Sequence, residues 1–558
     1  MRQAPSLVIQ VALRNALRHH QAGRLTEADQ IYRQILAIDA DHADSLHLLG
    51  MIAYQGGRHE LAVEMIRQAI AINGEQAPYH SNLGTVLQAQ GELDEAAACY
   101  ERALALQPAI AAIHTNLGNV LQAQGKLEEA VACQERALAL KPDCDAVLYN
   151  LGNALQAQDK LDDAVACYRR AVALKPDCAA VFYNLGNALL AQDNLDEAVA
   201  CYEQALAIKP DHAEAHHNLG CVFFALGNPD EALVRHRRAL AIQPDYAQAR
   251  FSESLAQLCK GDFAAGWRNY ESRWQTKEHD TPMRAYPQPF WTGEKLTSGR
   301  LLIWGEQGVG DEIMFAGLIP DVIRTGNRCV LDCDARLKPL FGRSFPGLEV
   351  VSGTDPGNDP ELEIAAHLPC GGLPGLFRTT SSAFAATTSP YLVADPAERE
   401  RLRARYADGR RLVGLAWYTK DRKTGRRRSI DLSLLAPLFA RSDIRWVSLQ
   451  YGDHNALENQ ATAAGARILI DHSVDQFSDV DLFAAQIAAM DLVVTIDNST
   501  AHLAGALGVP TWLLLPFAPD WRWLQAGEIS PWYPTMRLVR QPKPGGWQSV
   551  AQRVHSTL

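Results

Sequence analysis

The sequence lacks the long apolar runs that mark membrane proteins and secreted proteins. No run of roughly 18 apolar residues occurs, and Arg14 interrupts the amino-terminal stretch before it reaches the length of a signal peptide. The chain also lacks a basic balance, since its formal net charge is −11, whereas binding to nucleic-acid phosphates needs a concentrated positive surface. We therefore expect a cytoplasmic protein with no membrane span and no nucleic-acid partner.

Metal-binding and disulfide patterns are missing from the cysteines. The chain has 11 cysteines, an odd number, and no CxxC pair. Several of them recur at a fixed spacing, as small apolar residues in a repeated packing position do: Cys99, Cys133, Cys167 and Cys201. Asp332–Cys333–Asp334 has the form of a metal-dependent transferase motif, but nearby cationic groups can neutralise a leaving diphosphate without a metal. We expect neither a bound metal nor a cofactor.

What the sequence does contain is a 34-residue repeat. The most regular position is a glycine, found at Gly50, Gly84, Gly118, Gly152, Gly186 and Gly220. A leucine precedes each glycine, an alanine follows twelve residues later, and a proline closes five of the units, as at Pro108. Small residues at two fixed points and a terminal proline predict a solenoid of paired helices.

This pattern resembles tetratricopeptide repeats over residues 10–275, with about seven repeats and a degenerate end unit. Such end units cap a solenoid or contact the next domain. One asparagine per repeat is expected on the first helix, at Asn82, Asn116, Asn150, Asn184 and Asn218. The ladder is similar to the asparagine-lined groove of eukaryotic protein O-linked N-acetylglucosamine transferases, which implies an acceptor groove for a protein or peptide. Hydrogen bonding between neighbouring helices is the alternative role of these amides.

The second half of the chain predicts a different architecture. Residues 276–299 form a junction rich in Pro, Thr and Gly, without helical periodicity. Short apolar runs then alternate with helical stretches, which is typical of parallel strands in α/β sheets. The expected strands are 301–304, 329–332, 349–352, 412–417, 446–449, 492–496 and 512–515. We expect two Rossmann-like halves, residues 300–400 on the acceptor side and 401–558 on the donor side.

Three motifs follow strands of this half, where α/β sheets bind ligands. The first, WGEQGVGDEIMF, carries a glycine-rich loop and then Asp311 at the start of a helix. Its glycines, Gly305, Gly308 and Gly310, allow close approach of a ligand to the backbone. Asp311 is either a helix cap or a general base toward an acceptor hydroxyl.

The second motif is basic and the third opens a helix. Six of the nine residues Lys420–Arg428 are basic, which indicates either a phosphate grip or a solvated surface loop. In the third motif, TIDNSTAHLAGALGVP, a strand ends at Asp497, and a helix then begins that carries His502. Asn498, Ser499 and Thr500 open that helix as an anion site or as plain caps.

Together the motifs resemble the family 9 glycosyltransferases, the lipopolysaccharide heptosyltransferase group with the GT-B fold. The resemblance implies that Asp311 is the catalytic base and that Arg428 or its neighbours Arg426 and Arg427 hold the donor diphosphate. It further implies that Asp497 and His502 bind the donor sugar and phosphate. The family usually has a glycine where this chain has Ser499. A group of bacterial repeat-plus-transferase proteins shares a segment like PFAPDWRWL, in which Asp520, Trp521 and Arg522 either line the cleft or anchor the closing helix.

The sequence thus predicts a multidomain protein, an all-α tetratricopeptide-repeat solenoid followed by an α/β GT-B-like domain. The expected activity is metal-independent transfer of a sugar from a nucleotide-sugar substrate to an acceptor hydroxyl, on a protein presented by the repeats. The alternative is a non-catalytic adaptor that retains a transferase fold without its chemistry.

Overall fold

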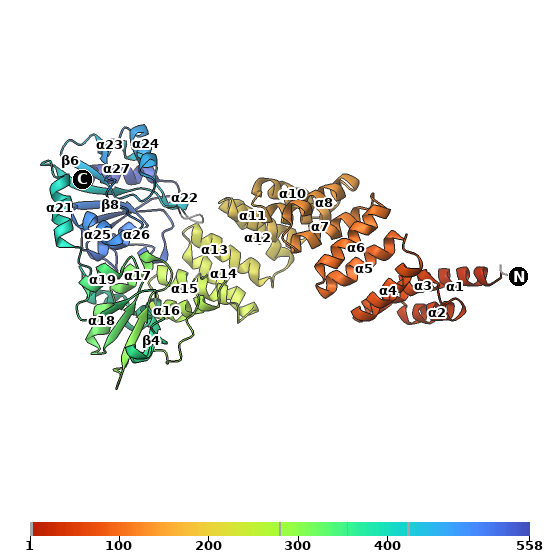
Figure 1. Ribbon diagram of the computed structural model, residues 1–558. Helices are drawn as coiled ribbons and strands as arrows, with labels where there is room; N and C mark the ends of the chain where they lie inside the picture. Colours follow the sequence, from red (N-terminus) through yellow and green to blue (C-terminus); the bar gives the residue numbers. More distant parts are fainter. Residues whose placement is uncertain (1–3, 278, 280, 354, 388, 421–424) are drawn as a thin grey trace. The chain divides into compact units, whose positions relative to one another are not determined.

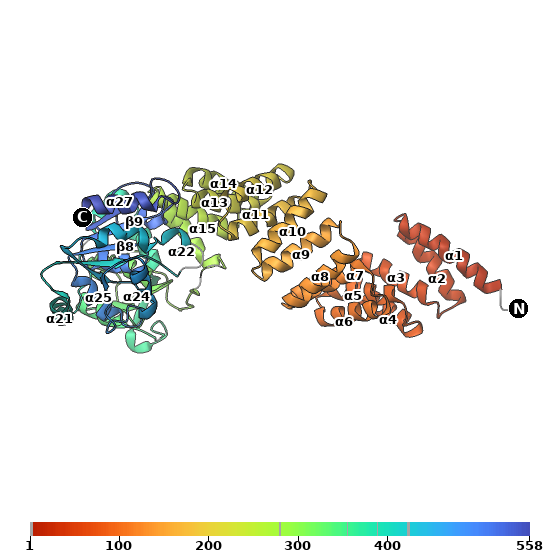
Figure 2. The ribbon, with the colours of Figure 1, turned by 90° about the horizontal axis from the view of Figure 1, so that it is seen from above.

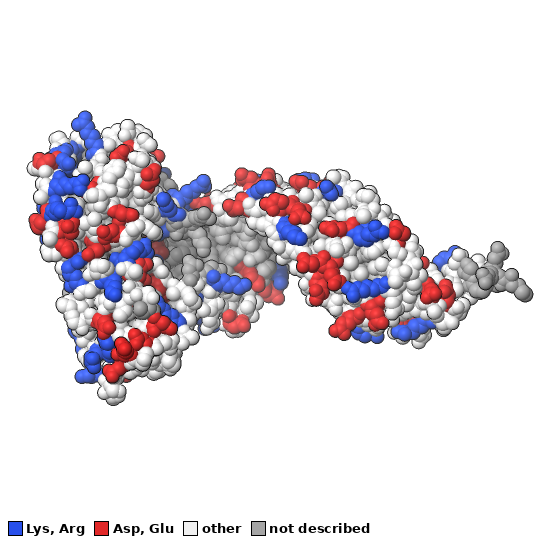
Figure 3. All heavy atoms as spheres, viewed as in Figure 1, with Lys and Arg blue, Asp and Glu red and all other residues white. Residues whose placement is uncertain are grey.

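The computed structural model describes residues 4–277, 279, 281–353, 355–387, 389–420 and 425–558. The chain divides into two compact units, Met1–Pro210 (unit 1) and Asp211–Leu558 (unit 2). Across the described residues, no helix has both the length and the apolar character that crossing a membrane requires. Basic and acidic side chains are interspersed over the visible face of each unit (Figure 3).

Unit 1 is built of helices alone, which pack in consecutive pairs (Figure 1). They are α1 (Ala4–Gln21), α2 (Leu25–Ile38), α3 (Ala43–Gln55), α4 (His59–Ile72), α5 (Ala77–Gln90), α6 (Leu93–Leu106), α7 (Ala111–Ala123), α8 (Leu127–Leu140), α9 (Asp145–Ala157), α10 (Leu161–Leu174), α11 (Ala179–Ala191) and α12 (Leu195–Ile208). The repeated glycine lies where paired helices cross: a Cβ on Gly152 would stand 2.6 Å from Cε1 of Tyr168. The expected solenoid is confirmed.

Unit 2 begins with further helices of the same kind, α13 (Ala213–Ala225), α14 (Pro229–Ile242), α15 (Ala247–Cys259) and α16 (Phe263–Tyr270). A 3₁₀ turn, η1 (Glu271–Gln275), follows α16. These helices belong to the same compact unit as the α/β part. A common core joins the last helix pair, α15 and α16, to the α/β part. In this core Trp267 packs against Trp521 and donates its indole N–H to the carbonyl of Arg378 at 2.9 Å.

The α/β part of unit 2 has two sheets, in which every strand pairing is parallel (Figures 1 and 2). The first lobe holds a sheet of order β3-β2-β1-β4, and the second lobe a sheet of order β10-β9-β8-β5-β6-β7. The strands are β1 (Arg300–Trp304), β2 (Cys329–Asp332), β3 (Glu349–Val351), β4 (Ile364–Pro369), β5 (Arg411–Ala416), β6 (Ile444–Ser448), β7 (Ile468–Leu469), β8 (Leu492–Ile496), β9 (Thr511–Leu515) and β10 (Met536–Arg540). Each expected strand is present, and β4, β7 and β10 were not expected.

Helices connect the strands of both lobes. In the first lobe they are α17 (Val309–Ala316), α18 (Ile319–Arg324), α19 (Lys338–Ser344), α20 (Leu373–Phe377) and α21 (Pro396–Tyr406), the last of which leads into the second lobe. The second lobe adds α22 (Gly425–Arg428), α23 (Ala436–Phe439), α24 (His454–Ala463), α25 (Val480–Ala488), α26 (Ser499–Ala506) and α27 (Trp547–Thr557). The short 3₁₀ turn η6 (Trp521–Trp523) follows β9.

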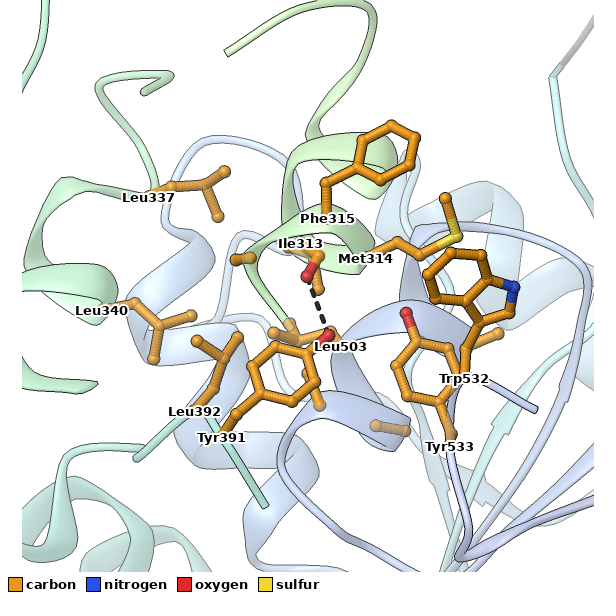
Figure 4. Close-up of a cluster of buried hydrophobic side chains, with 14 of the residues drawn as sticks. Ile313, Met314, Phe315, Leu337, Leu340, Tyr391, Leu392, Leu503, Trp532 and Tyr533 are labelled. Carbon is orange, nitrogen blue, oxygen red and sulfur yellow. Dashed lines mark hydrogen bonds between the residues drawn. The ribbon is translucent and has the colours of Figure 1, made fainter. Parts of the chain in front are cut away.

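One hydrophobic core runs through both lobes. Figure 4 shows Ile313 and Phe315 of α17 close to Tyr391, Leu503 of α26 and Trp532. The Tyr391 hydroxyl donates to the carbonyl of Ile313 at 2.8 Å. This shared core holds α17 of the first lobe against α26 of the second, and these helices carry the first and third sequence motifs.

Candidate functional site

A cavity of about 850 Å³ lies between the two lobes of unit 2, a volume within the range of ligand pockets. Its wall is formed by segments that follow β1, β2, β5, β6, β7, β8 and β9 at their carboxyl ends, as expected for ligand sites in parallel sheets. Residues of all three sequence motifs meet there: Gly310, Asp311, Arg428, Asp497, Asn498, Ser499 and His502. The structure therefore brings three distant segments to one place.

Other residues of the same motifs lie outside the cavity wall. Gly305 packs beneath the loop, where a Cβ would stand 2.5 Å from the carboxyl carbon of Glu312, and Gly308 is the N-cap of α17. Thr500 is fully buried on α26. Arg426 is exposed, and Arg427 donates to the carbonyl of Ala225 on α13 at 3.5 Å. Among the arginines of the basic motif that the structure describes, Arg428 is thus the one that reaches the cavity.

The glycine-rich loop is held by the last helical turn before the junction. Glu306 is buried and accepts two hydrogen bonds from Arg273 of η1, at 2.9 Å each. The backbone N–H of Gly371 donates to the same carboxylate at 2.8 Å. Gln307 has a φ of 66° and donates to the Tyr270 hydroxyl at 2.8 Å. These contacts fix an unfavourable backbone conformation and so set where α17 starts.

Asp311 lies in the first turn of α17 rather than at its N-cap. Its carboxylate faces the cavity and accepts a hydrogen bond from Nη2 of Arg522 on η6, which belongs to the other lobe. Nη1 of Arg522 donates to Asp520 at 2.7 Å. Burial alone would lower the pKa of Arg522, but Asp311 and Asp520 raise it well above its ordinary value.

The neighbouring carboxyl group, Glu312, has a different environment. It lies beneath the loop and accepts the backbone N–H of Asp334 at 2.9 Å. Burial raises its pKa to about 7. Of these adjacent acids, Asp311 is therefore the one whose carboxylate can meet a ligand in the cavity.

The basic motif contributes two side chains to the cavity wall, Lys420 and Arg428. Nη1 of Arg428 lies 3.4 Å from Oδ2 of Asp497, so α22 is tied to the end of β8. Residues 421–424 of this motif lie outside the described part of the chain. The cavity thus has basic side chains on the wall formed by the second lobe.

The third motif forms the part of the same wall that lies next to Arg428. Asn498 is the N-cap of α26, and its Oδ1 accepts the backbone N–H of Ala501 at 3.3 Å. Its Nδ2 is buried without a hydrogen-bond partner among the described residues, and Asn498 is one of the residues that line the cavity. The observed contact is that of a helix cap, and the role of this helix start as an anion site stays a prediction.

His502 is held as a neutral ring. Its Nδ1 lies 2.9 Å from the Tyr533 hydroxyl, and its ring stacks on Trp523 with centroids 5.1 Å apart. Burial, with a smaller effect of Arg522, lowers the pKa of His502 to about 4. At neutral pH the histidine can therefore exchange a hydrogen bond with a ligand but adds no positive charge.

Several residues of the cavity wall carried little signal in the sequence. The sequence left two roles for Arg522, lining the cleft or anchoring the closing helix, and the structure places it in the cavity wall. Tyr451 follows the end of β6, and the tendency of parallel sheets to bind ligands at the carboxyl ends of their strands could have predicted it. Gln476 is buried in the wall, and Phe477 is 66% exposed beneath the guanidinium of Arg336. No local pattern distinguishes these last residues.

The asparagine ladder takes part in hydrogen bonds between repeats. In unit 1, Nδ2 of Asn82 lies 2.8 Å from Nε2 of His47, in the preceding repeat. Nδ2 of Asn184 donates to Asn153 at 2.8 Å and to Tyr149 at 3.1 Å. Asn116 and Asn150 are half-buried on α7 and α9, and Asn218 is half-buried on α13 of unit 2. The amides that are seen to bond therefore act between neighbouring helices, and the peptide-groove role stays a prediction.

The acidic pair around Cys333 is engaged by arginines. Asp332 accepts a hydrogen bond from Arg284, and Asp334 pairs with Arg336 at 2.8 Å. In the described part of the chain, His, Cys, Asp and Glu side chains nowhere gather in threes with the geometry of a metal site.

Comparison with known proteins identifies the repeats. Tetratricopeptide-repeat profiles match residues 19–83, 75–143, 109–177 and 177–245. The helical repeats are tetratricopeptide repeats. Their presence supports the interpretation of this region as a protein-interaction scaffold. Protein FlbA of Caulobacter vibrioides is 31% identical over 328 residues, which is 55% of this chain and 54% of FlbA. The chain therefore spans about half the length of this curated relative.

Solved structures resemble the repeat region. YrrB, described as a TPR protein with an unusual peptide-binding site, is 29% identical and covers 35% of this chain and 100% of its own, with a TM-score of 0.31. MamA is 25% identical and covers 30% of this chain and 97% of its own, with a TM-score of 0.28. Pseudomonas aeruginosa pilF is 22% identical and covers 37% of this chain and 95% of its own, with a TM-score of 0.34.

Proposed function

We propose that unit 2 is a metal-independent glycosyltransferase that uses a nucleotide-sugar donor. The observation that carries the proposal is the meeting, in one cavity of about 850 Å³, of the carboxylate of Asp311 with the basic and amide groups of the opposite lobe. A nucleotide sugar has an anionic diphosphate next to a neutral sugar. It needs cations and N–H donors on one wall and a base near the reacting carbon, and the cavity offers both.

The diphosphate would contact the second lobe. Arg428 supplies charge, Nδ2 of Asn498 supplies a buried unpaired donor, and α26 supplies the N-terminal amides that favour anions. The lobes also approach each other at Gly310, where a Cβ would stand 3.3 Å from the His502 ring. These groups act on charge that develops on the leaving diphosphate.

Asp311 would act on the acceptor. Its carboxylate takes the proton of the acceptor hydroxyl while the hydroxyl oxygen forms a bond to the anomeric carbon of the sugar. The bond from that carbon to the diphosphate oxygen breaks, and the electron pair leaves with the nucleoside diphosphate. General-base catalysis of this kind contributes about 10²–10⁴-fold in rate.

The acceptor would be a protein segment presented by the repeats. Repeats of this class stack into an extended surface suited to a peptide, and α13–α16 belong to the same compact unit as the cavity. Asn82, Asn116, Asn150, Asn184 and Asn218 are the proposed contacts along this surface.

Turnover of the donor tests the proposal. Release of nucleoside diphosphate is measured with UDP-, GDP-, ADP- and CMP-sugars, CMP being the leaving group in the last case. We expect one donor to be turned over, and Asp311→Asn to lower the rate by about 10²–10⁴-fold. Glu312→Gln is the matched control, because this adjacent acid lies outside the cavity wall, and it should keep the wild-type rate. Full activity of Asp311→Asn refutes the role of Asp311.

A non-catalytic adaptor is the second candidate. Pairing of Asp311 with Arg522 favours it, because the guanidinium occupies the carboxylate that would have to meet the acceptor hydroxyl. An adaptor would bind nucleotides or a protein partner and turn over no donor.

A further inference from the structure

Arg522 is a firmly held cation of the cavity wall. Its side chain is 15% exposed, its guanidinium lies over the Trp521 ring at 4.5 Å from the centroid, and Asp520 fixes Nη1. The other terminal nitrogen, Nη2, is the one that meets Asp311. A guanidinium with one nitrogen anchored and the other at a cavity is suited to phosphate oxygens.

The ion pair between Asp311 and Arg522 conflicts with the task of each residue. It joins the lobes across the cavity, and it occupies both the Asp311 carboxylate and the terminal nitrogen of Arg522 that faces the cavity. His502 lies in the same wall, and burial lowers its pKa to about 4. The donor diphosphate would bring a stronger anion into the same space.

We propose that Arg522 is a donor-binding residue that exchanges the Asp311 carboxylate for the donor diphosphate, and so releases Asp311 to act as the base. This inference rests on the proposed function. It gives the pairing of Asp311 with Arg522 a role, because it makes donor binding a condition for activating the acceptor.

If Arg522 exchanges its partner, substitutions at Asp311 and at Arg522 should change the affinity for nucleoside diphosphate in opposite directions. Calorimetry on the full chain measures this affinity. Asp311→Asn removes the competing carboxylate, so affinity should rise by about tenfold, which is about 1.4 kcal/mol. Arg522→Ala should weaken binding by at least about tenfold, and the double variant should match Arg522→Ala. A purely structural ion pair would weaken binding in both single variants.

Two outcomes overturn the inference. Binding that is unchanged or weaker in Asp311→Asn refutes exchange while leaving the proposed function intact. Failure of UDP, GDP, ADP and CMP to bind the wild-type chain refutes both. A crystal structure of the wild-type chain with its nucleoside diphosphate needs no variant: Nη2 of Arg522 should lie within hydrogen-bond distance of a phosphate oxygen, and a retained pair with Asp311 contradicts exchange.

Discussion

The buried pair of Arg273 and Glu306 should be the interaction that most strongly couples the last repeat helices to the glycine-rich loop. Both side chains are fully buried, and the two parallel hydrogen bonds are each 2.9 Å long. Glu306→Gln removes the buried counter-charge of the guanidinium and leaves it the half-exposed Glu271. Removing one member of a buried pair costs about 3–5 kcal/mol, which is the loss we expect in the free energy of unfolding of unit 2.

The same arginine offers a matched control. Glu271 accepts a hydrogen bond from Nη1 of Arg273 at 2.8 Å, but its side chain is 53% exposed. Exposed ion pairs contribute below about 1 kcal/mol, so Glu271→Gln should change stability little. Urea unfolding followed by tryptophan fluorescence measures both, because all 11 tryptophans lie in unit 2. Equal losses in the two variants would refute the assignment of Glu306 as the anchor of the loop.

Two further predictions use the same assay. A Cβ on Gly505 would stand 2.4 Å from the Tyr533 ring, whereas one on Gly342 meets nothing within 4 Å; Gly505→Ala should destabilise unit 2 by about 1–3 kcal/mol, and Gly342→Ala should stabilise it by about 0.5–1 kcal/mol. A destabilising Gly342→Ala would contradict this comparison. Burial lowers the pKa of His236 to about 3, so the unfolded chain binds its proton first, and stability falls as pH drops from about 6.5 toward 3. Between pH 7 and pH 5 the free energy of unfolding of the wild type should fall by about 2 kcal/mol more than that of His236→Gln. Glutamine is chosen because Gln134 occupies the equivalent position in another repeat. Equal losses would show that His236 is not buried as a neutral ring.

The sequence predicted the fold well because its signals are local. A 34-residue period and apolar runs ending in glycine or aspartate are properties of short segments, and they indicated the solenoid and most strands. The strand β4 was missed because its Ala365–Ala366 pair favours helix over strand. The strand β10 was missed because Arg537 and Arg540 interrupt its apolar run, and β7 has only 2 residues.

The site was predictable only in part, for the same reason. Strand-end motifs pointed to Asp311, Arg428 and Asp497, which do meet in the cavity. The contact between Asp311 and Arg522 joins residues 211 positions apart, and no local pattern encodes it. Gln476 and Phe477 likewise reach the cavity through tertiary packing of loops.

The central claim is that unit 2 holds a nucleotide sugar between its lobes, and thermal unfolding tests it most directly. Tryptophan fluorescence follows unit 2 while UDP-, GDP-, ADP- and CMP-sugars are added in turn. A ligand that binds the native state at about 100 times its Kd stabilises it by about 2.7 kcal/mol, so one donor should raise the unfolding temperature of the wild type, and less in Arg522→Ala. No rise with any of the four donors at millimolar concentration would contradict the account.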